Sequence, residues 1–367
     1  SYAAVTTNNP LNAFGLKLQQ RSITEADFNP ELLNNPSATP DFSAKFEIHQ
    51  PLVNTEMLYQ RKAAGKQVEM YELLSERTRE YLSFETEQSY LQLQLAYEKN
   101  KVWNEALIAA KADYKASRDY YEQGLIQKSD VLNAELHVTN NETQLKNSFS
   151  EIGDASDQLS MLMGRATGTV YTIDTIGIAN AVFANTGDLP DARSDFKAMN
   201  KGMESYDMMI RSSKMSYLPR LNAFASWQLN DNSMLGFNAN SHLAGIQLSW
   251  NIFNGNRTKN IISQQRLEKE KLVTQLDQQK SEARVAINHA RRQLSDASFF
   301  MKQQKLAVEQ ASEALRVLQN RYTQGLVKTT DVLLAQTQLS QQKLGYVHAL
   351  FNYNLSAATL KFLMISK

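Results

Sequence analysis

The sequence predicts a mainly α-helical protein that contains two copies of a long helical hairpin, each preceded by β-strands. The first observation is a repeated string, Tyr-x-Gln-Gly-Leu-x-x-x-x-Asp-Val-Leu-x-Ala, at 121–134 and 322–335. The second is a heptad spacing of apolar residues from 276 to 322. The third is the alternation of apolar and polar residues in two segments before the second long helix. Each copy of the string ends one helical pattern and starts another, so the chain reads as a repeat protein.

The apolar residues of the second long helix form a seam with alternating steps of three and four, broken only at polar Gln304. The seam consists of Leu276, Ala283, Ile287, Ala290, Leu294, Ala297, Met301, Val308, Ala311, Leu315, Leu318 and Tyr322. A second apolar stripe, which includes Ala286 and Phe300, indicates contact with helices on two sides, as in the wall of a helical barrel.

We predict long helices at about 56–121 and 258–322, each about 100 Å in length. Shorter return helices are predicted at about 129–163 and 330–364. Between the two copies we expect an irregular segment, with a strand-like stretch at 169–173, and then a helix at about 191–215.

The predicted strands lie just before the long helices. Leu221–Leu229 and Ile246–Ile252 alternate and flank a turn-like stretch at 230–241, which predicts a hairpin with one apolar and one mixed face. Such strands are long enough to cross a bilayer when tilted. A matching strand is predicted at 42–49, after a polar loop at about 9–41.

These elements divide the chain into a first structural repeat (1–164), an equatorial linker (165–190) and a second structural repeat (191–367). The first repeat lacks the helix and most of the opening strand that the second one has. We therefore expect at least about 35 residues to precede Ser1 in the full protein.

Composition excludes several classes of function. The 39 Lys and Arg balance 38 Asp and Glu, so no basic footprint indicates nucleic-acid binding. Cysteine is absent, which excludes disulfides, thiolate metal sites and cysteine nucleophiles. The five histidines have no metal-ligand spacing, and no catalytic motif occurs. We expect no enzyme activity, no cofactor and no metal. No run of about 18 apolar residues predicts a transmembrane helix.

The repeated turns have a structural interpretation. Gly124-Leu125 and Gly325-Leu326 are typical of a helix that ends at a left-handed glycine with an apolar residue behind it.

Each aspartate of the repeated string has a structural interpretation too. Asp130 and Asp331 follow Ser129 and Thr330, which predicts a hydroxyl N-cap with a carboxylate in the first helical turn.

The order of these elements resembles the TolC-like outer-membrane efflux protein family over essentially the whole chain. The resemblance is carried by Leu218-Pro-Arg-Leu at a strand start, Asn251-Ile-Phe-Asn-Gly255 at a strand exit, and the two turns. It implies a homotrimer in the Gram-negative outer membrane that extends into the periplasm. Four strands from each chain would form one 12-stranded barrel, and the helices would form an α-barrel that closes at a periplasmic tip.

The resemblance also implies partners. They would be a periplasmic adaptor (membrane fusion) protein, an inner-membrane transporter and outer-membrane lipid. The chain would then be the passive exit duct of a tripartite efflux or type I secretion system. Independently of the family, four strands cannot close a barrel, and open edges in lipid leave backbone groups unpaired, so a membrane-inserted chain must oligomerise.

The resemblance assigns a pore constriction to Asp130 and Asp331, which would favour cations. Family members often carry a second acidic residue three positions on in the second repeat, where this chain has Leu334; the first repeat has Asn133. The constriction is therefore expected to be less cation-selective.

The same family places the Gly-Leu turns at the edge that docks the adaptor, where an exposed leucine can anchor a partner helix. Trp227, Trp250 and Phe253 are either ordinary surface residues of the barrel or an aromatic belt at the membrane interface.

A different class of function fits the helices as well. A soluble coiled-coil structural protein, or a periplasmic adaptor, would also have long helical hairpins. Adaptors usually have one such hairpin between compact β domains, whereas this sequence predicts two hairpins and strands that alternate as lipid-facing strands do.

Overall fold

The computed structural model describes residues 1–174, 176–178 and 190–365. The chain forms two compact units: unit 1 comprises Ser1–Val68 and Lys201–Leu272, and unit 2 comprises Glu69–Asn200 and Val273–Lys367. Each unit contains parts of both sequence repeats. The boundaries 1–164, 165–190 and 191–367 therefore stay a prediction about repeats, and positions 175 and 179–189 of the linker lie outside the described residues.

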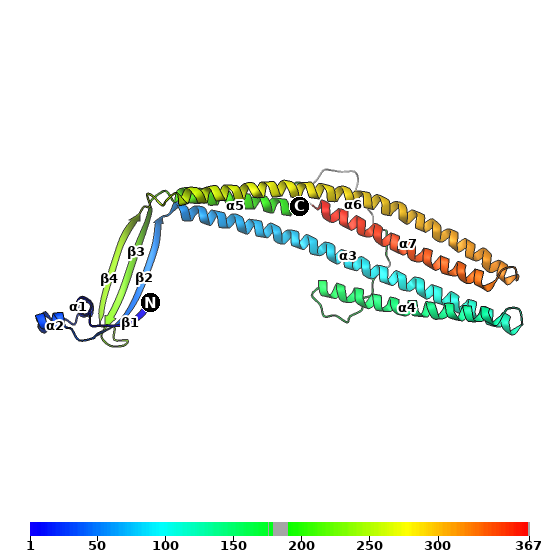
Figure 1. Ribbon diagram of the computed structural model, residues 1–367, viewed down its shortest axis with the longest axis horizontal. Helices are drawn as coiled ribbons and strands as arrows, with labels where there is room; N and C mark the ends of the chain where they lie inside the picture. The colour runs from blue at the N-terminus through cyan, green and yellow to red at the C-terminus, as the bar shows by residue number, and fades with distance from the viewer. Residues whose placement is uncertain (175, 179–189, 366–367) are drawn as a thin grey trace. The chain divides into compact units, whose positions relative to one another are not determined.

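The predicted helices are confirmed, with bounds close to those expected. They are α3 (Thr55–Glu122), α4 (Lys128–Leu162), α5 (Ser194–Met215), α6 (Arg257–Thr323) and α7 (Thr329–Met364) (Figure 1). The two long helices have 68 and 67 residues, which corresponds to about 100 Å each.

The strands form one antiparallel sheet in unit 1. Its order is β1 (Tyr2–Thr7), β2 (Thr39–Val53), β3 (Arg220–Asp231) and β4 (Ala239–Ser249) (Figure 1). The prediction that the last strand continues to Ile252 was wrong. Ser249 pairs with Arg220, the first residue of β3, so residues after Ser249 have no β3 partner in the ladder.

Strand register confirms the apolar and the mixed face. Directly opposite residues share a face, and Phe46 lies opposite Trp227, as Ala223 lies opposite Ile246. The apolar face thus contains Ala44, Phe46, Ile48, Leu221, Ala223, Ala225, Trp227, Leu229, Ala244, Ile246 and Leu248. Its large side chains are mostly exposed, for example Phe46 at 64% and Ile246 at 68%. A single chain therefore leaves a wide apolar surface uncovered.

The segment from 9 to 41 is not the irregular loop that the sequence predicted. It forms α1 (Pro10–Gln19), the 3-10 helix η1 (Glu25–Phe28) and α2 (Pro30–Asn34). In both α1 and α2, proline occupies the first helical turn, and the side chain of the preceding asparagine accepts a backbone N–H. The Asn-Pro pairs at 9–10 and 29–30 are helix-start signals, which the polar composition of the segment concealed.

A buried polar network holds α1 to the end of the sheet. Gln20 Nε2 donates to the Pro40 carbonyl at 2.7 Å and to Asp41 Oδ1 at 2.9 Å. Asn230 Nδ2 donates to both carboxylate oxygens of Asp41, at 3.2 and 3.0 Å. Because these groups satisfy one another, the buried carboxylate has hydrogen-bond partners within unit 1.

Unit 2 is held together by narrow seams of small and large apolar residues. Six residues of the predicted α6 seam are buried: Leu276, Ala283, Ile287, Ala290, Met301 and Leu315. On the other hairpin, buried residues of α3 and α4 pack together, namely Leu93 and Ala96 against Ile152, Ala155 and Leu159. The long helices therefore depend on side-by-side packing for their stability.

Gln304, the polar residue that interrupts the apolar seam of α6, lies next to Gly345 of α7. A Cβ atom on Gly345 would lie 2.7 Å from Gln304 Oε1, so the missing side chain leaves room for the glutamine.

The stretch at 169–173 is not a strand, contrary to prediction. Its Tyr171 carbonyl accepts a hydrogen bond from Tyr97 Oη at 2.8 Å, and Tyr171 and Ile173 pack on the α3–α4 cluster. This stretch packs against helices and has no neighbouring strand among the described residues. Because a strand needs a paired strand, its β-branched residues do not form one.

None of the helices in the described part of the chain combines the length and the apolar composition that a membrane-spanning helix requires.

Asp113 of α3 is expected to make stability depend on pH. Burial raises the pKa of this carboxyl from 3.8 to about 6, and its Oδ2 atom has no hydrogen-bond partner in the described residues. The folded protein therefore carries a penalty above about pH 6 that disappears as the pH falls toward 4. The penalty is about 1 kcal/mol after allowance for partial exposure.

We predict that Asp113→Asn raises the thermal unfolding midpoint at pH 8, and that this gain disappears by about pH 4. Exposed Asp119 of the same helix provides the control variant Asp119→Asn, which should show no such pH-dependent gain. An equal gain for Asp113→Asn at both pH values would contradict the assignment.

Candidate functional site

The first hairpin turn ends α3 with a left-handed glycine. Gly124 has a φ of 76°, and its N–H donates to the Tyr121 carbonyl at 2.8 Å. The next N–H, of Leu125, donates to the Tyr120 carbonyl at 2.9 Å. These two bonds define a Schellman motif, which satisfies carbonyls at the helix end. The predicted glycine C-cap is confirmed.

The second turn has the same geometry. Gly325 has a φ of 72° and donates to the Tyr322 carbonyl at 2.9 Å, while Leu326 donates to the Arg321 carbonyl at 3.0 Å. The two copies of the string therefore fold alike, as the repeat predicted.

The hydroxyl residues are not the N-caps, and this part of the prediction was wrong. α4 begins one residue before Ser129 and α7 one residue before Thr330, so the N-caps are Gln127 and Lys328. The aspartate at the third helical position defines the start in each case, because its carboxylate accepts the N–H of the N-cap residue.

The two aspartates make equivalent hydrogen bonds. The backbone N–H of Gln127 donates to Asp130 Oδ2 at 3.2 Å, and that of Lys328 donates to Asp331 Oδ2 at 3.1 Å. Each carboxylate also lies where the helix N-terminus favours negative charge. Asp130 is half-buried and Asp331 is exposed.

The two turns lie side by side in unit 2. The rings of Tyr120 and Tyr322 pack edge to face with centroids 5.5 Å apart, and Tyr322 Oη lies 3.0 Å from Thr329 Oγ1. A depression of about 760 Å³ between the turns is lined by both of them, including Leu125, Asp130 and Gly325.

The remaining predicted turn residues are not part of that lining. Asp331 and Asn133 are exposed, and Leu326 is 61% exposed. Leu125 is 66% exposed although it borders the depression. The structure thus places one carboxylate in the depression and the other outside it.

A contact between the return helices was not predicted. His137 Nε2 of α4 lies 3.3 Å from Thr337 Oγ1 of α7. Burial lowers the pKa of His137, which favours the neutral ring. Its Nδ1 has no hydrogen-bond partner in the described residues. A histidine seven positions after Asp130 was the available signal, but a lone histidine on a helix does not identify its partner.

The predicted interface aromatics are all exposed: Trp227 at 55%, Trp250 at 59% and Phe253 at 78%. Trp250 follows the end of β4, and its Nε1 donates to the Tyr217 carbonyl at 3.0 Å. Trp227 lies toward the other end of the sheet, near the β3–β4 turn.

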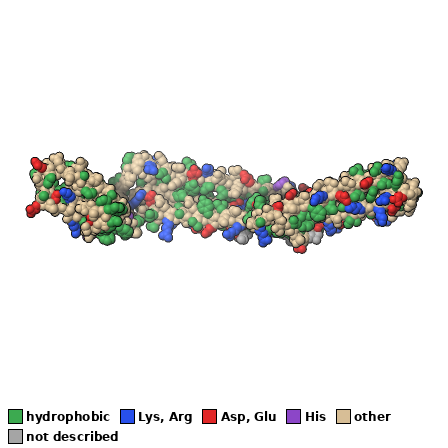
Figure 2. All heavy atoms as spheres, turned by 90° about the horizontal axis from the view of Figure 1, so that it is seen from below, with side chains coloured by type: hydrophobic (Ala, Val, Ile, Leu, Met, Phe, Trp, Pro, Cys, Tyr) green, Lys and Arg blue, Asp and Glu red, His purple; other side chains and the backbone are tan. Residues whose placement is uncertain are grey.

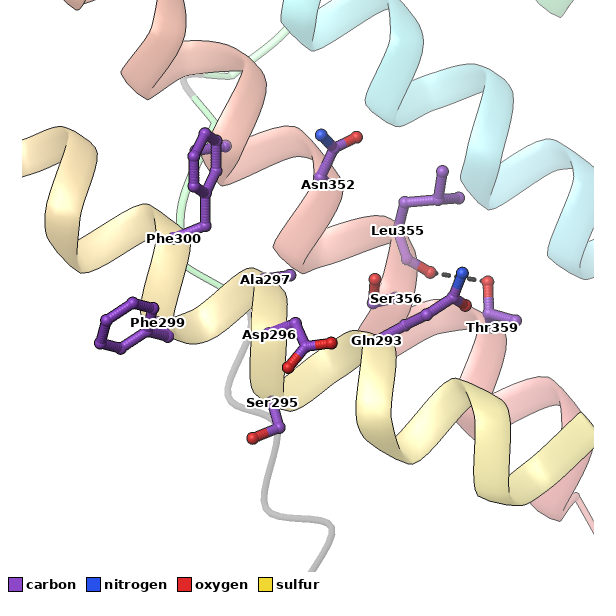
Figure 3. A pocket seen from close by; sticks show the side chains of 11 residues that line it. Gln293, Ser295, Asp296, Ala297, Phe299, Phe300, Asn352, Leu355, Ser356 and Thr359 are labelled. Atoms are coloured by element: carbon purple, nitrogen blue, oxygen red, sulfur yellow. Dashed lines mark hydrogen bonds between the residues drawn. The ribbon is translucent and has the colours of Figure 1, made fainter.

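A second depression, of about 990 Å³, lies between α6 and α7 (Figure 3). Phe300 extends toward α7, whereas Phe299 points away from it (Figure 3). The two rings are 51% and 66% exposed, so each leaves apolar area that the described residues do not cover.

Charged side chains of both signs are interspersed on the face shown in Figure 2, and neither sign gathers into one large patch there. Among the described residues, no group of three or more His, Cys, Asp or Glu side chains has an arrangement suited to a metal ion.

A four-stranded antiparallel sheet together with duplicated long helical hairpins matches the fold of the protomers of known outer-membrane efflux channels. The family model for outer membrane efflux proteins matches residues 17–165 and 188–364. The chain therefore belongs to the outer membrane efflux protein family.

Solved structures of this architecture have similar folds but little sequence identity. The crystal structure of CusC matches with a TM-score of 0.79 and 14% identity, covering 100% of this chain and 82% of that chain. VceC from Vibrio cholerae matches with a TM-score of 0.74 and 17% identity, covering 100% of this chain and 86% of that chain. The open state of MtrE from Neisseria gonorrhoeae matches with a TM-score of 0.72 and 11% identity, covering 99% of this chain and 79% of that chain. No curated protein sequence matches the chain.

The chain is an efflux channel of the Gram-negative outer membrane that extends into the periplasm. The family consists of channels and not of enzymes, and the soluble coiled-coil or adaptor alternative is not favoured. Channels of this family form trimers in tripartite efflux systems.

The turn glycines yield a stability prediction. Gly124→Ala and Gly325→Ala should each lower the free energy of unfolding by about 1 kcal/mol, because a Cβ atom disfavours positive φ. Gly153 lies inside α4, and a Cβ atom there meets nothing within 4 Å. Gly153→Ala should therefore stabilise by about 0.5–1 kcal/mol.

Chemical unfolding of the three variants, followed by circular dichroism, measures these differences. Equal stabilities for Gly124→Ala and Gly153→Ala would contradict the C-cap assignment.

Proposed function

We propose that this chain is the passive exit duct of a tripartite efflux or type I secretion system, gated at the paired turns. The observation that carries the proposal is the pair of matched turns, packed through Tyr120 and Tyr322, with a carboxylate and an exposed leucine on each copy of the repeat. The duct hydrolyses nothing, and an inner-membrane transporter supplies the energy.

The functional form is a homotrimer. Four strands cannot close into a barrel, and every backbone group left unpaired in lipid costs several kcal/mol. Three copies supply twelve strands, an even number in the range of bacterial barrels. Neighbouring copies would also cover exposed aromatics of the helices, such as Phe149, Phe299 and Phe300.

The apolar face of the sheet then contacts lipid. Trp227 and the position level with Trp250 are about eight residues apart, which is about 26 Å along the strand and about 20 Å along the barrel axis at the usual strand tilt. This spacing falls within the apolar band of about 25 Å in outer-membrane barrels, which aromatic girdles flank at both interfaces. Trp227, Trp250 and Phe253 are therefore proposed as the interfacial aromatic residues.

The gate is formed by Asp130, Asp331 and Asn133. Three copies bring six carboxylates to the constriction, which favours cations. Leu334 is 71% exposed where a second acidic residue would add charge, so the preference is moderate. Opening is a shift of the helix hairpins between two packings at the turns.

The adaptor docks on the Gly-Leu turns. Leu125 and Leu326 are 66% and 61% exposed, and an apolar side chain at a rigid turn suits a partner's helical groove.

The gate is tested by charge removal without loss of the cap. Asp130→Asn with Asp331→Asn keeps a side-chain oxygen for the N-cap N–H but removes six charges from a trimer. We expect the ratio of cation to anion permeability in planar bilayers to fall several-fold. Exposed Asp154 of α4 serves as the control, and Asp154→Asn should leave the ratio unchanged. An unaltered ratio in the double variant would remove these aspartates from the pore.

Docking is tested by charging the turn leucines. Leu125→Asp with Leu326→Asp should abolish complementation of an efflux-deficient strain while trimers persist, because a buried charge without a partner opposes association. Leu11 of α1 is 81% exposed, and Leu11→Asp should retain efflux. Full efflux by the turn variant would refute the docking role.

A further inference from the structure

We infer that Glu47 is the residue that keeps one level of the barrel lumen, at Lys45, close to electrical neutrality, so that cargo of either charge can pass. This inference rests on the proposed trimeric barrel. It concerns the sheet in unit 1 and not the turns in unit 2.

Glu47 lies on the mixed face of the sheet. In β2, Lys45, Glu47 and His49 alternate with Phe46 and Ile48, which belong to the apolar face. When the apolar face contacts lipid, the face of Glu47 lines the lumen.

Three charged or titratable residues of this face lie in one row on β2. A further charged residue of the face, Arg220, pairs with Ser249 at the far end of β3, and its Nη2 lies 2.5 Å from Glu56 Oε2, so that charge has its own partner. The following residues of the same face are uncharged: Ser43, Asn222, Phe224, Ser226, Gln228, Ser241, Leu243, Gly245, Gln247 and Ser249. Asp41 at the loop end is buried and accepts hydrogen bonds from Gln20 and Asn230.

A single carboxylate oxygen of Glu47 contacts both of the other side chains in the row. Lys45 Nζ and His49 Nε2 each lie 3.3 Å from Glu47 Oε1. The side chains of Lys45 and Glu47 are both 40% exposed, and that of His49 is 65% exposed. The row therefore faces open space, and its charges are available to a passing solute.

Removal of the carboxylate leaves an uncompensated lysine on every chain. A trimer would then carry at least three positive charges at one level of the lumen. Charges of one sign in a pore with low-dielectric walls raise the local concentration of the opposite ion. Loss of Lys45 would leave the carboxylates and reverse the sign.

The absence of cysteine makes a local measurement possible. Ser226 lies directly opposite Glu47 on β3, so Ser226→Cys places a thiol probe at the level of the row. Purified trimers are treated with methanethiosulfonate reagents of equal size that carry a negative or a positive charge. The ratio of the two modification rates reports the local potential, independently of the constriction at the turns.

We expect Glu47→Gln to raise the anionic-to-cationic rate ratio about fivefold, and Lys45→Gln to lower it by a similar factor. Glu31 of α2 lies outside the strands, and Glu31→Gln should leave the ratio unchanged. The same ratio in Glu47→Gln as in its parent would overturn the inference.

The orientation of the sheet is checked separately. Ala225→Cys lies on the apolar face and should resist both reagents in membrane-embedded trimers, whereas Ser226→Cys should react. The reverse pattern in conducting trimers would overturn the inference and the lipid-facing assignment of the apolar face, but it would leave the proposed exit duct standing. Failure of the parent protein to form trimers or channels would refute the proposed function itself.

Discussion

The free edges of the sheet are the constraint on which the rest of the structure depends. In the described residues, β1 and β4 are the outer strands of the sheet, and each is paired along one edge. Backbone groups along these edges require partners, and in lipid only further copies of the chain can supply them. Closure then determines which face of the sheet meets lipid and which meets water. When the sheet closes into a barrel, its apolar face contacts lipid and its mixed face contacts water, and no single side chain decides this.

A second level of organisation comes from the helix ends. Each long helix reverses at a left-handed glycine, and the return helix begins at a carboxylate that accepts the N-cap N–H. These local hydrogen bonds fix where the chain turns, so the two copies of the hairpin end at the same level and their tyrosines meet. The same residues that cap helices thereby become available for a gate and a docking edge. Structural and functional roles coincide at the turns because both require a rigid, exposed reversal of the chain.

Much of this fold could be predicted from the sequence, because long periodic patterns average over local noise. The heptad seam of α6 identified residues that are buried, among them Ala283 and Ile287, and alternation identified β3 and the last part of β4. Predictions failed where the preference of a single residue or short segment was overridden by neighbouring residues or by tertiary packing. Ser129 is a residue type that often caps helices. The helix start is nevertheless set by Asp130, which lies three positions after the actual N-cap residue, Gln127. Thr169–Ile173 has strand-forming residues but packs against helices instead. The contact between His137 and Thr337 joins residues 200 positions apart, and no spacing rule connects them.

The number of chains in the assembled particle tests the central claim most directly. Native mass spectrometry of the detergent-solubilised protein measures it without reference to any one residue. The account predicts a particle of three times the mass of the purified chain, which dissociates on heating. A monomer that stays soluble without detergent would contradict it, because a single four-stranded sheet with free edges cannot form a membrane channel.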